Sequence, residues 1–399
     1  MRAVEAGDVC RHSREGAFLA AAVALAALAL PWLGYELFRL LWQPRTIGTI
    51  AIHPGAIDFE IFRAMLGDWF AGRPVYTGPK STVNTYLPAS MLLFWPVYGW
   101  ASRSVALFAW FVATAVALAW LVRCMVRESG AQGKAERAFV ALLPLATYPA
   151  GAIVGNGQST LFVLALLLAA LVTLRDREPG WGRDLAVALC LLFALVKPTV
   201  AAPFVVAAAC VDGGFRPVVL AAVAYAATTL LAATAQPESL PDLLRQFLVV
   251  ASHMSTHRGE SNLHRLLGDL AWQAWAAPVS LAILALFAAW TRRHRRADLW
   301  LIAGAAAIVA RFWSYHRWYD DLLIVVPLVA LYRLARRSAP GDATAKVAGA
   351  LFAATLLFLL APGGLYALPA PWNDVYRGVQ IALWLAALVV LSFAARTSG

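Results

Sequence analysis

The chain has 399 residues, of which 61% are hydrophobic and 14% charged, whereas a soluble protein carries about a quarter charged residues. Its net charge of +11 comes from short basic clusters between long apolar runs, as the positive-inside rule expects, and no basic stripe with interleaved aromatics is present. These features exclude a soluble enzyme and a nucleic-acid partner, and they predict an all-α, polytopic integral membrane protein.

Hydropathy predicts about twelve transmembrane helices, near 17–41, 104–122, 138–152, 158–174, 185–197, 199–211, 217–234, 275–290, 298–312, 320–335, 346–361 and 377–395. The loops with the densest Lys and Arg then fall on one side, which predicts cytoplasmic termini and a multi-pass protein of the cell inner (plasma) membrane. The chain, 1–399, is predicted to form one integral domain with outer loops at 43–85 and 235–274. Within the second loop, the amphipathic segment 239–250 predicts an interfacial helix.

The first outer loop, 43–85, carries the carboxylate best placed for chemistry. Asp58 lies between Ile57 and Phe59, and further apolar residues follow at helical spacing. This pattern predicts a short interfacial helix with Asp58 near its start. A carboxylate on this side of the membrane can act as a general base on an acceptor hydroxyl. A solvated loop aspartate is the simpler alternative, and Glu60 is a competing candidate for the base.

The next apolar segment, Tyr86 to Trp100, is short and contains Pro88 and Pro96. Counting it as a full span would put the basic cluster at 123–137 outside, against the positive-inside rule. We therefore interpret it as a re-entrant or partial helix, which is tolerated where neighbouring protein satisfies its backbone.

Two predicted span ends on the outer side carry polar residues. Gln158 lies in the turn Gly155 to Ser159, where its amide can offer both a donor and an acceptor to a sugar; a plain interhelical turn is the alternative. Lys197, followed by Pro198, lies in otherwise apolar sequence, where a lysine usually faces a partner or a polar cavity. Two uses are open for it: binding a phosphate, or snorkelling from a span end.

Three histidines in the second outer loop, His253, His257 and His264, have the spacing of one helix face. Gly259 interrupts that face and no carboxylate is fixed by the spacing, so no metal site is predicted. The alternatives for these histidines are binding the polar head of an acceptor or no role in chemistry.

The run 311–321 joins two predicted spans on the same outer side as Asp58. It contains Arg311, His316 and Arg317 together with several large aromatics. Arginine binds phosphate through a planar fork, and interfacial aromatics cover apolar lipid and sugar faces. The run is therefore predicted to bind a lipid phosphate and a sugar ring, with an aromatic belt and snorkelling arginines as the alternative.

These residues together resemble glycosyltransferase family 87, a family of polyprenyl-phosphate-mannose-dependent mannosyltransferases with the GT-C membrane fold. The resemblance rests on Asp58-Phe59 with the motif at 72–76 (Gly-Arg-Pro-Val-Tyr), Tyr86-Leu87-Pro88, the motif at 157–161 (Gly-Gln-Ser-Thr-Leu), and Lys197-Pro198. His316 with Tyr319 extends it toward the C-terminal end. Each motif alone is weak, and together they are more specific. Leu87 departs from the family, whose members often have proline there.

The resemblance implies an inverting transfer of a hexose, mannose above all, from a polyprenyl-phosphate donor to a lipid or glycolipid acceptor on the outer face. It implies that Asp58 is the base. With the resemblance in view, Lys197, His316 and Arg317 are the candidates for the donor phosphate, and Gln158 is the candidate for the sugar pocket. From residue type and position, Arg311 is added to the phosphate candidates. Tyr86, Tyr319, Glu60, His257 and His264 are added to the sugar and acceptor candidates. No cofactor or metal is predicted, because no DxD motif lies outside the membrane.

A secondary transporter is the main rival from another class, since broken helices such as the one at Lys197-Pro198 are common in transporters. Transporters usually show interrupted helices paired in two repeated halves, and the sequence shows no such pairing. Another GT-C enzyme with a different lipid-linked sugar is the second rival, because the choice of sugar depends on the shape of the pocket.

Overall fold

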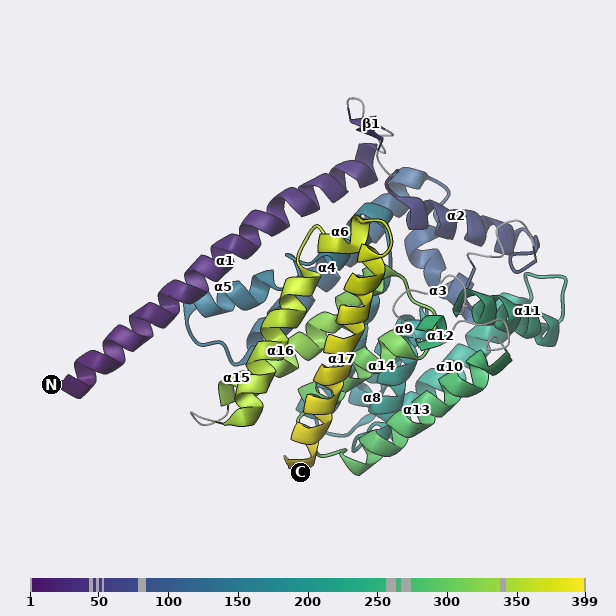
Figure 1. Cartoon of the computed structure of the whole chain (residues 1–399). Coiled ribbons are helices and arrows are strands. Elements are labelled where there is room, and N and C mark those ends of the chain that lie inside the picture. Colours follow the sequence, from purple (N-terminus) through teal and green to yellow (C-terminus); the bar gives the residue numbers. More distant parts are fainter. Residues whose placement is uncertain are drawn as a thin grey trace.

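The computed structural model describes residues 2–42, 46–47, 50–51, 54–77, 84–255, 263–266, 274–337 and 342–397. These residues are helical apart from turns, loops and an antiparallel hairpin, in which β1 (Thr46–Ile47) pairs with β2 (Ile50–Ala51). The predicted all-α fold class is confirmed (Figure 1).

The helices follow one another with short connections. The first group comprises α1 (Arg2–Trp42), α2 (Ile57–Phe70), α3 (Pro88–Tyr98), α4 (Arg103–Ser129), α5 (Lys134–Leu142) and α6 (Tyr148–Asn156). The second comprises α7 (Thr160–Asp176), α8 (Trp181–Ala194), α9 (Pro198–Cys210), α10 (Phe215–Ala233), α11 (Leu240–His253) and α12 (Leu263–Leu266). The third comprises α13 (Ala276–Arg293), α14 (Leu299–Phe312), η4 (Trp318–Ile324), α15 (Val325–Arg337), α16 (Ala343–Leu359), η5 (Gly364–Ala367) and α17 (Trp372–Thr397).

Several helices have the length and composition of membrane spans. Within the described residues, four helices qualify: α1 from Glu15 to Trp42, α4, α10 and α17; the bent pair α6–α7 would make a fifth. Three further apolar helices, α9, α14 and α16, have 13 to 17 residues, fewer than the ~20 that cross a bilayer. The helices confirm a membrane protein, whereas the count of twelve spans and the GT-C architecture stay predictions.

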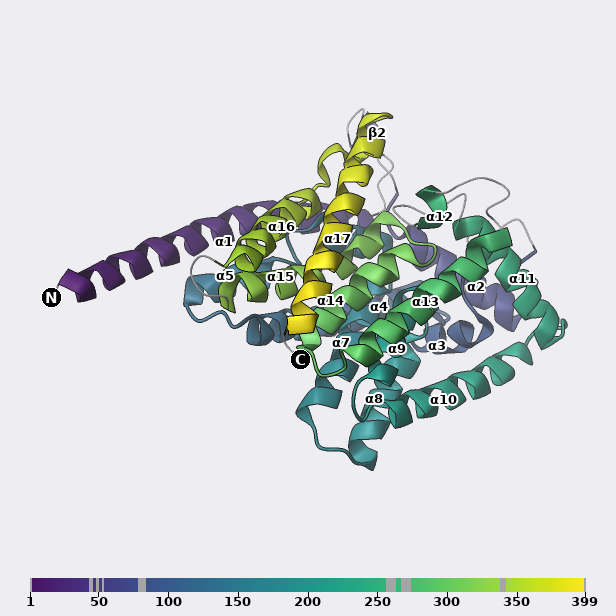
Figure 2. The same ribbon diagram turned by 60° about the horizontal axis from the view of Figure 1, so that its bottom comes forward.

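The centre of the bundle is α14, whose residues from Trp300 to Phe312 are all buried. It packs against α7, α9, α13, α15 and α17, and Figure 2 shows it between α13 and α17. Small residues allow this close packing: a side chain on Gly304 would meet Leu391 and Pro327. The helix is therefore shielded on all sides, and its C-terminal end leads into the run 311–321.

Two predicted spans have different boundaries from those expected. The segment 138–152 is divided between α5 and α6, because Pro144 lies between them and cannot continue a helix. The segment 320–335 begins as the 3₁₀ helix η4 and becomes α-helical only at Val325.

The two short helices expected near the outer face are present. The segment 86–100 forms the 11-residue helix α3, which begins at Pro88 and contains Pro96. Its depth in a membrane stays a prediction. The segment 239–250 lies in α11, whose first turn is capped by the Ser239 side chain accepting the backbone N–H of Asp242.

Candidate active site

The helix α2 holds Asp58 in its first turn. Phe59 and Phe62 belong to a set of buried apolar residues at spacings of three and four, so one face of the helix packs on the protein. Ala56, just before the helix, has a φ of 58°, and its N–H donates to the carbonyl of Gly155 over 2.7 Å. This hydrogen bond joins the start of α2 to the end of α6. The structure therefore contains the predicted short helix with Asp58 near its start.

The turn between α6 and α7 brings Gln158 to Asp58. The two helices meet at 117°, and Gly157 makes the turn with a φ of 70°. The side-chain amide of Gln158 donates a hydrogen bond to the Asp58 carboxylate. Its Oε1 accepts the backbone N–H of Ser159 over 2.6 Å. The orientation of the amide is therefore fixed from both ends.

Gly157→Ala is expected to destabilise the protein more than Gly130→Ala. Both glycines have positive φ, 70° and 75°, which costs an alanine about 1–2 kcal/mol. A Cβ at Gly157 would also lie 2.5 Å from the Cβ of Phe59, whereas one at Gly130 would meet nothing within 4 Å. Thermal unfolding of the two purified variants measures the difference. Equal losses would mean that the close approach to α2 is unimportant.

A buried ion pair lies next to Asp58. Lys197 directly precedes Pro198, the first residue of α9, and is 5% exposed. Its Nζ donates to Asp320 Oδ1 over 2.6 Å and to Thr160 Oγ1 over 2.8 Å, and lies 4.9 Å from the ring centroid of Tyr319. Thr160 Oγ1 also donates to Asp320 Oδ1 over 2.7 Å. A lysine in apolar surroundings needs such partners, so the ion pair explains how this position is tolerated.

His316 is held by the other oxygen of the same carboxylate. Its Nδ1 lies 3.2 Å from Asp320 Oδ2, which also accepts the backbone N–H of Arg317 over 3.3 Å. Burial lowers the pKa of His316 to about 4 against the opposing effect of Asp320, so the imidazole is neutral at neutral pH. Because the carboxylate only accepts, we assign the proton to Nδ1. Nε2 then carries a lone pair, and among the described residues it has no hydrogen-bond partner.

The electrostatic surroundings of Asp58 suit a base. Its side chain is half-buried, and burial raises the pKa of Asp58 from 3.8 to about 6. The positive charges of Lys197 and Arg317 oppose this rise, and the negative charge of Asp320 adds to it. A carboxylate with this pKa is ionised at neutral pH and still accepts a proton better than an ordinary aspartate does.

Two tyrosines complete the surroundings of Asp58. Tyr86 and Tyr319 both lie within electrostatic range of its carboxylate. The Tyr86 ring packs edge-on against Phe62 and Phe94. The structure thus brings together seven of the residues singled out from the sequence: Asp58, Tyr86, Gln158, Lys197, His316, Arg317 and Tyr319.

Arg311 lies behind this cluster. It is 0% exposed and forms an ion pair with Asp321, which also accepts a hydrogen bond from the Tyr148 hydroxyl. The Tyr148 hydroxyl in turn accepts from Gln380 of α17 over 3.2 Å. Arg311 therefore joins α14 to η4, α6 and α17.

Three other sequence candidates lie apart from the cluster or outside the described residues. Glu60 accepts from the Nε of Arg103 over 2.6 Å. His264 Nε2 lies 2.9 Å from the Oγ of Ser280 and 3.0 Å from the carbonyl oxygen of Trp313. His257 lies in the range 256–262, outside the described residues.

Sequence reasoning missed Asp320 and Thr160, which join Lys197 to His316. The signal was present in the sequence, because a lysine in apolar surroundings implies a carboxylate partner. Which carboxylate that is depends on how η4 packs against α7 and α9. No group of three His, Cys, Asp or Glu side chains among the described residues could hold a metal ion. The absence of a metal requirement stays a prediction.

The family profile of glycosyltransferase family 87 matches residues 84–362, well over half of the chain. The matched region contains Gln158, Lys197 and His316, and Asp58 precedes it. No curated protein and no solved structure matches the chain. Because the family match covers more than half of the chain, the chain belongs to glycosyltransferase family 87 and is a glycosyltransferase.

Proposed function

We propose that the protein transfers a hexose from a polyprenyl-phosphate donor to a lipid or glycolipid acceptor, with mannose as the preferred sugar and Asp58 as the general base. The observation that carries the proposal is a half-buried carboxylate of raised pKa beside the cations Lys197 and Arg317. Displacement of a phosphate-linked sugar needs both kinds of group. The base receives the proton of the attacking hydroxyl, and the cations stabilise the leaving phosphate.

The proposed step is a single displacement. The acceptor hydroxyl oxygen bonds to the anomeric carbon from the face opposite the phosphate, and its proton passes to Asp58. The bond between the anomeric carbon and the phosphate oxygen breaks, which inverts the anomeric centre and leaves a polyprenyl phosphate. The leaving phosphate gains negative charge, so Lys197 and Arg317 stabilise the transition state more than the ground state.

His316 is better suited to the sugar than to the phosphate. With Nδ1–H directed at Asp320, its Nε2 can accept but not donate a hydrogen bond. Phosphate oxygens are themselves acceptors, whereas a sugar hydroxyl can donate. We therefore assign His316 to a donor-sugar hydroxyl, which refines the sequence-based assignment to the phosphate.

An apolar cavity supports a donor carried on a lipid. It has a volume of about 390 Å³, lies between α3, α4, α7 and α8, and is lined by apolar side chains. Phe94 in its wall packs on Tyr86, and Val196 in its wall directly precedes Lys197. An isoprenoid chain in this cavity would therefore lie beside the cation that we assign to its phosphate. Under the positive-inside orientation this site faces away from the cytoplasm, where sugar nucleotides are made.

Sugar transfer by the purified protein tests the donor. Radiolabelled polyprenyl-phosphate-mannose and a membrane lipid extract should give a labelled lipid product. GDP-mannose without a lipid carrier should give none, and polyprenyl-phosphate-glucose should react more slowly. Transfer from the sugar nucleotide would contradict the lipid-linked donor, and a preference for glucose would contradict mannose.

Transfer should be lost as the pH falls through about 6. Asp58 must be ionised to accept a proton, and its pKa of about 6 means that kcat/KM should fall about tenfold per pH unit below that value. An aspartate with the ordinary value of 3.8 would give a flat profile down to pH 5. Enzyme held at pH 5 and returned to pH 7.5 should regain full activity, which separates titration from unfolding.

A further inference from the structure

A second cavity, of about 830 Å³, lies where α13 and α17 end. It is lined by five arginines, Arg292, Arg293, Arg295, Arg296 and Arg396, and by His294. No carboxylate lines it. Three segments contribute these side chains: the last turn of α13, the connection to α14, and the last turn of α17. Residues 292–296 are contiguous, and packing of the bundle brings Arg396, from the end of α17, to the same cavity.

Most of the positive charge in this cavity is not neutralised by the protein. Arg295 has a carboxylate partner, Asp212, at 3.0 Å. Asp298 at the start of α14 instead pairs with Arg333 and Arg337, at 2.5 and 2.8 Å. The other four cavity arginines have no ion-pair partner among the described residues. These four arginines are exposed to solvent, which screens their charge, and their shared positive potential still favours an anion over a cation in the cavity.

The cavity lies at the ends of α13 and α17, where the exposed apolar surfaces of the two helices give way to arginines. α17 is a candidate span with exposed apolar residues such as Val389 and Phe393 shortly before Arg396. α13 exposes Leu281 and Leu286 in the same way, and Trp290 lies in the cavity wall. Tryptophan and arginine at a span end are typical of the membrane–water boundary.

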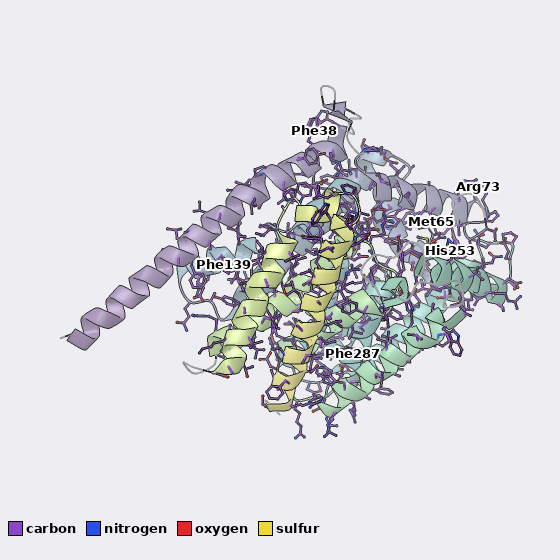
Figure 3. All side chains as sticks on the ribbon, in the orientation of Figure 1. Phe38, Met65, Arg73, Phe139, His253 and Phe287 are labelled. Carbon is purple, nitrogen blue, oxygen red and sulfur yellow. The ribbon has the colours of Figure 1, made fainter. Side chains whose placement is uncertain are left out.

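This end of the bundle is remote from the candidate active site. In Figure 1 the C-terminus lies at the bottom, and α2 lies near the top right. Figure 3 labels Phe287 of α13 toward the bottom, far from Met65 of α2 and from Arg73, which follows it. A ligand in the basic cavity would therefore not touch Asp58 or the groups around it.

We propose that the basic cavity binds the phosphate of an anionic phospholipid headgroup, with the acyl chains along the apolar outer faces of α13 and α17. Arginine forks bind phosphate oxygens in pairs, and basic pockets at span ends accept anionic headgroups. The positive-inside rule alone requires only basic residues on one side. It does not require that Arg396, at the end of α17, meet the unpaired arginines of the run 292–296 around one cavity.

Binding of defined lipids to the purified full-length protein tests the proposal. Phosphatidylglycerol should bind more tightly than phosphatidylcholine with the same acyl chains, as followed by native mass spectrometry. Arg292→Gln/Arg396→Gln should weaken phosphatidylglycerol binding by about 30-fold, which corresponds to about 2 kcal/mol for two arginines. The charge-matched control, Arg123→Gln/Arg177→Gln, removes exposed arginines outside the cavity and should leave binding unchanged.

Three results would overturn the proposal. Equal losses in the two double variants would reduce the effect to overall charge. Equal affinity for the two lipids would remove the role of the anionic headgroup. Soluble glycerol phosphate binding as tightly as phosphatidylglycerol would make the cavity a site for a free anion. Arg292→Lys/Arg396→Lys, which keeps the charge without the forks, should bind between the wild type and the glutamine variant.

Discussion

Replacing Asp58 by asparagine is expected to slow sugar transfer by about 10²–10⁴-fold, the contribution that a general base typically makes. Asparagine has nearly the same shape and can still accept the hydrogen bond from Gln158, so the start of α2 should stay in place. Donor binding should be retained, because the cations that we assign to the phosphate are unchanged. Transfer of radiolabelled sugar and binding of the donor, both measured on Asp58→Asn, separate these effects.

Glu60→Gln is the matched control for this variant. It removes one negative charge two residues along the same helix, but Glu60 is 44% exposed at its side chain and pairs with Arg103. An exposed ion pair contributes little, so the variant should transfer sugar near the wild-type rate. The reverse result, with Asp58→Asn active and Glu60→Gln inactive, would move the base to Glu60 and contradict the proposed role of Asp58.

The parts of the site that sequence could predict are those encoded by local pattern. The apolar spacing after Asp58 predicts α2, and the structure places this helix with its apolar face buried. Lys197 before Pro198 is predicted to lie at a helix end, and it lies in the short connection between α8, which ends at Ala194, and α9, which begins at Pro198. Gln158 is predicted to lie in a turn, and Gly157 makes that turn with positive φ. In each case neighbouring residues alone determine the conformation.

What sequence could not predict depends on which distant segments meet. Asp320 and Asp321 are adjacent, yet one pairs with Lys197 of the α8–α9 junction and the other with Arg311 of α14. In the 3₁₀ helix η4, with about three residues per turn, successive side chains point about 120° apart, so the two carboxylates meet different partners. No local pattern distinguishes them. In the same way, residue type alone predicts that Arg311 binds a phosphate, and it does not reveal that Asp321 is its partner in the fold.

The buried pair of Lys197 and Asp320 carries the second large expected effect. Asp320→Leu should destabilise the protein by about 3–5 kcal/mol, because it leaves the Lys197 ammonium in apolar surroundings without its counter-charge. Lys197→Met should destabilise the protein in the same way, because it leaves the Asp320 carboxylate buried without its counter-charge. The double variant Lys197→Met/Asp320→Leu should recover much of the loss, since no buried charge is then uncompensated at this pair.

Sugar transfer separates this structural role from the proposed chemical one. If Lys197 stabilises the leaving phosphate, the double variant should stay about 10²–10³-fold slower than the wild type even when its thermal unfolding is restored. Packing can replace the attraction between Lys197 and Asp320, but no apolar side chain can stabilise the charge that develops on a phosphate. A stable double variant with near wild-type transfer would make the pair a packing feature, and Arg317 would then be the cation that acts on the donor.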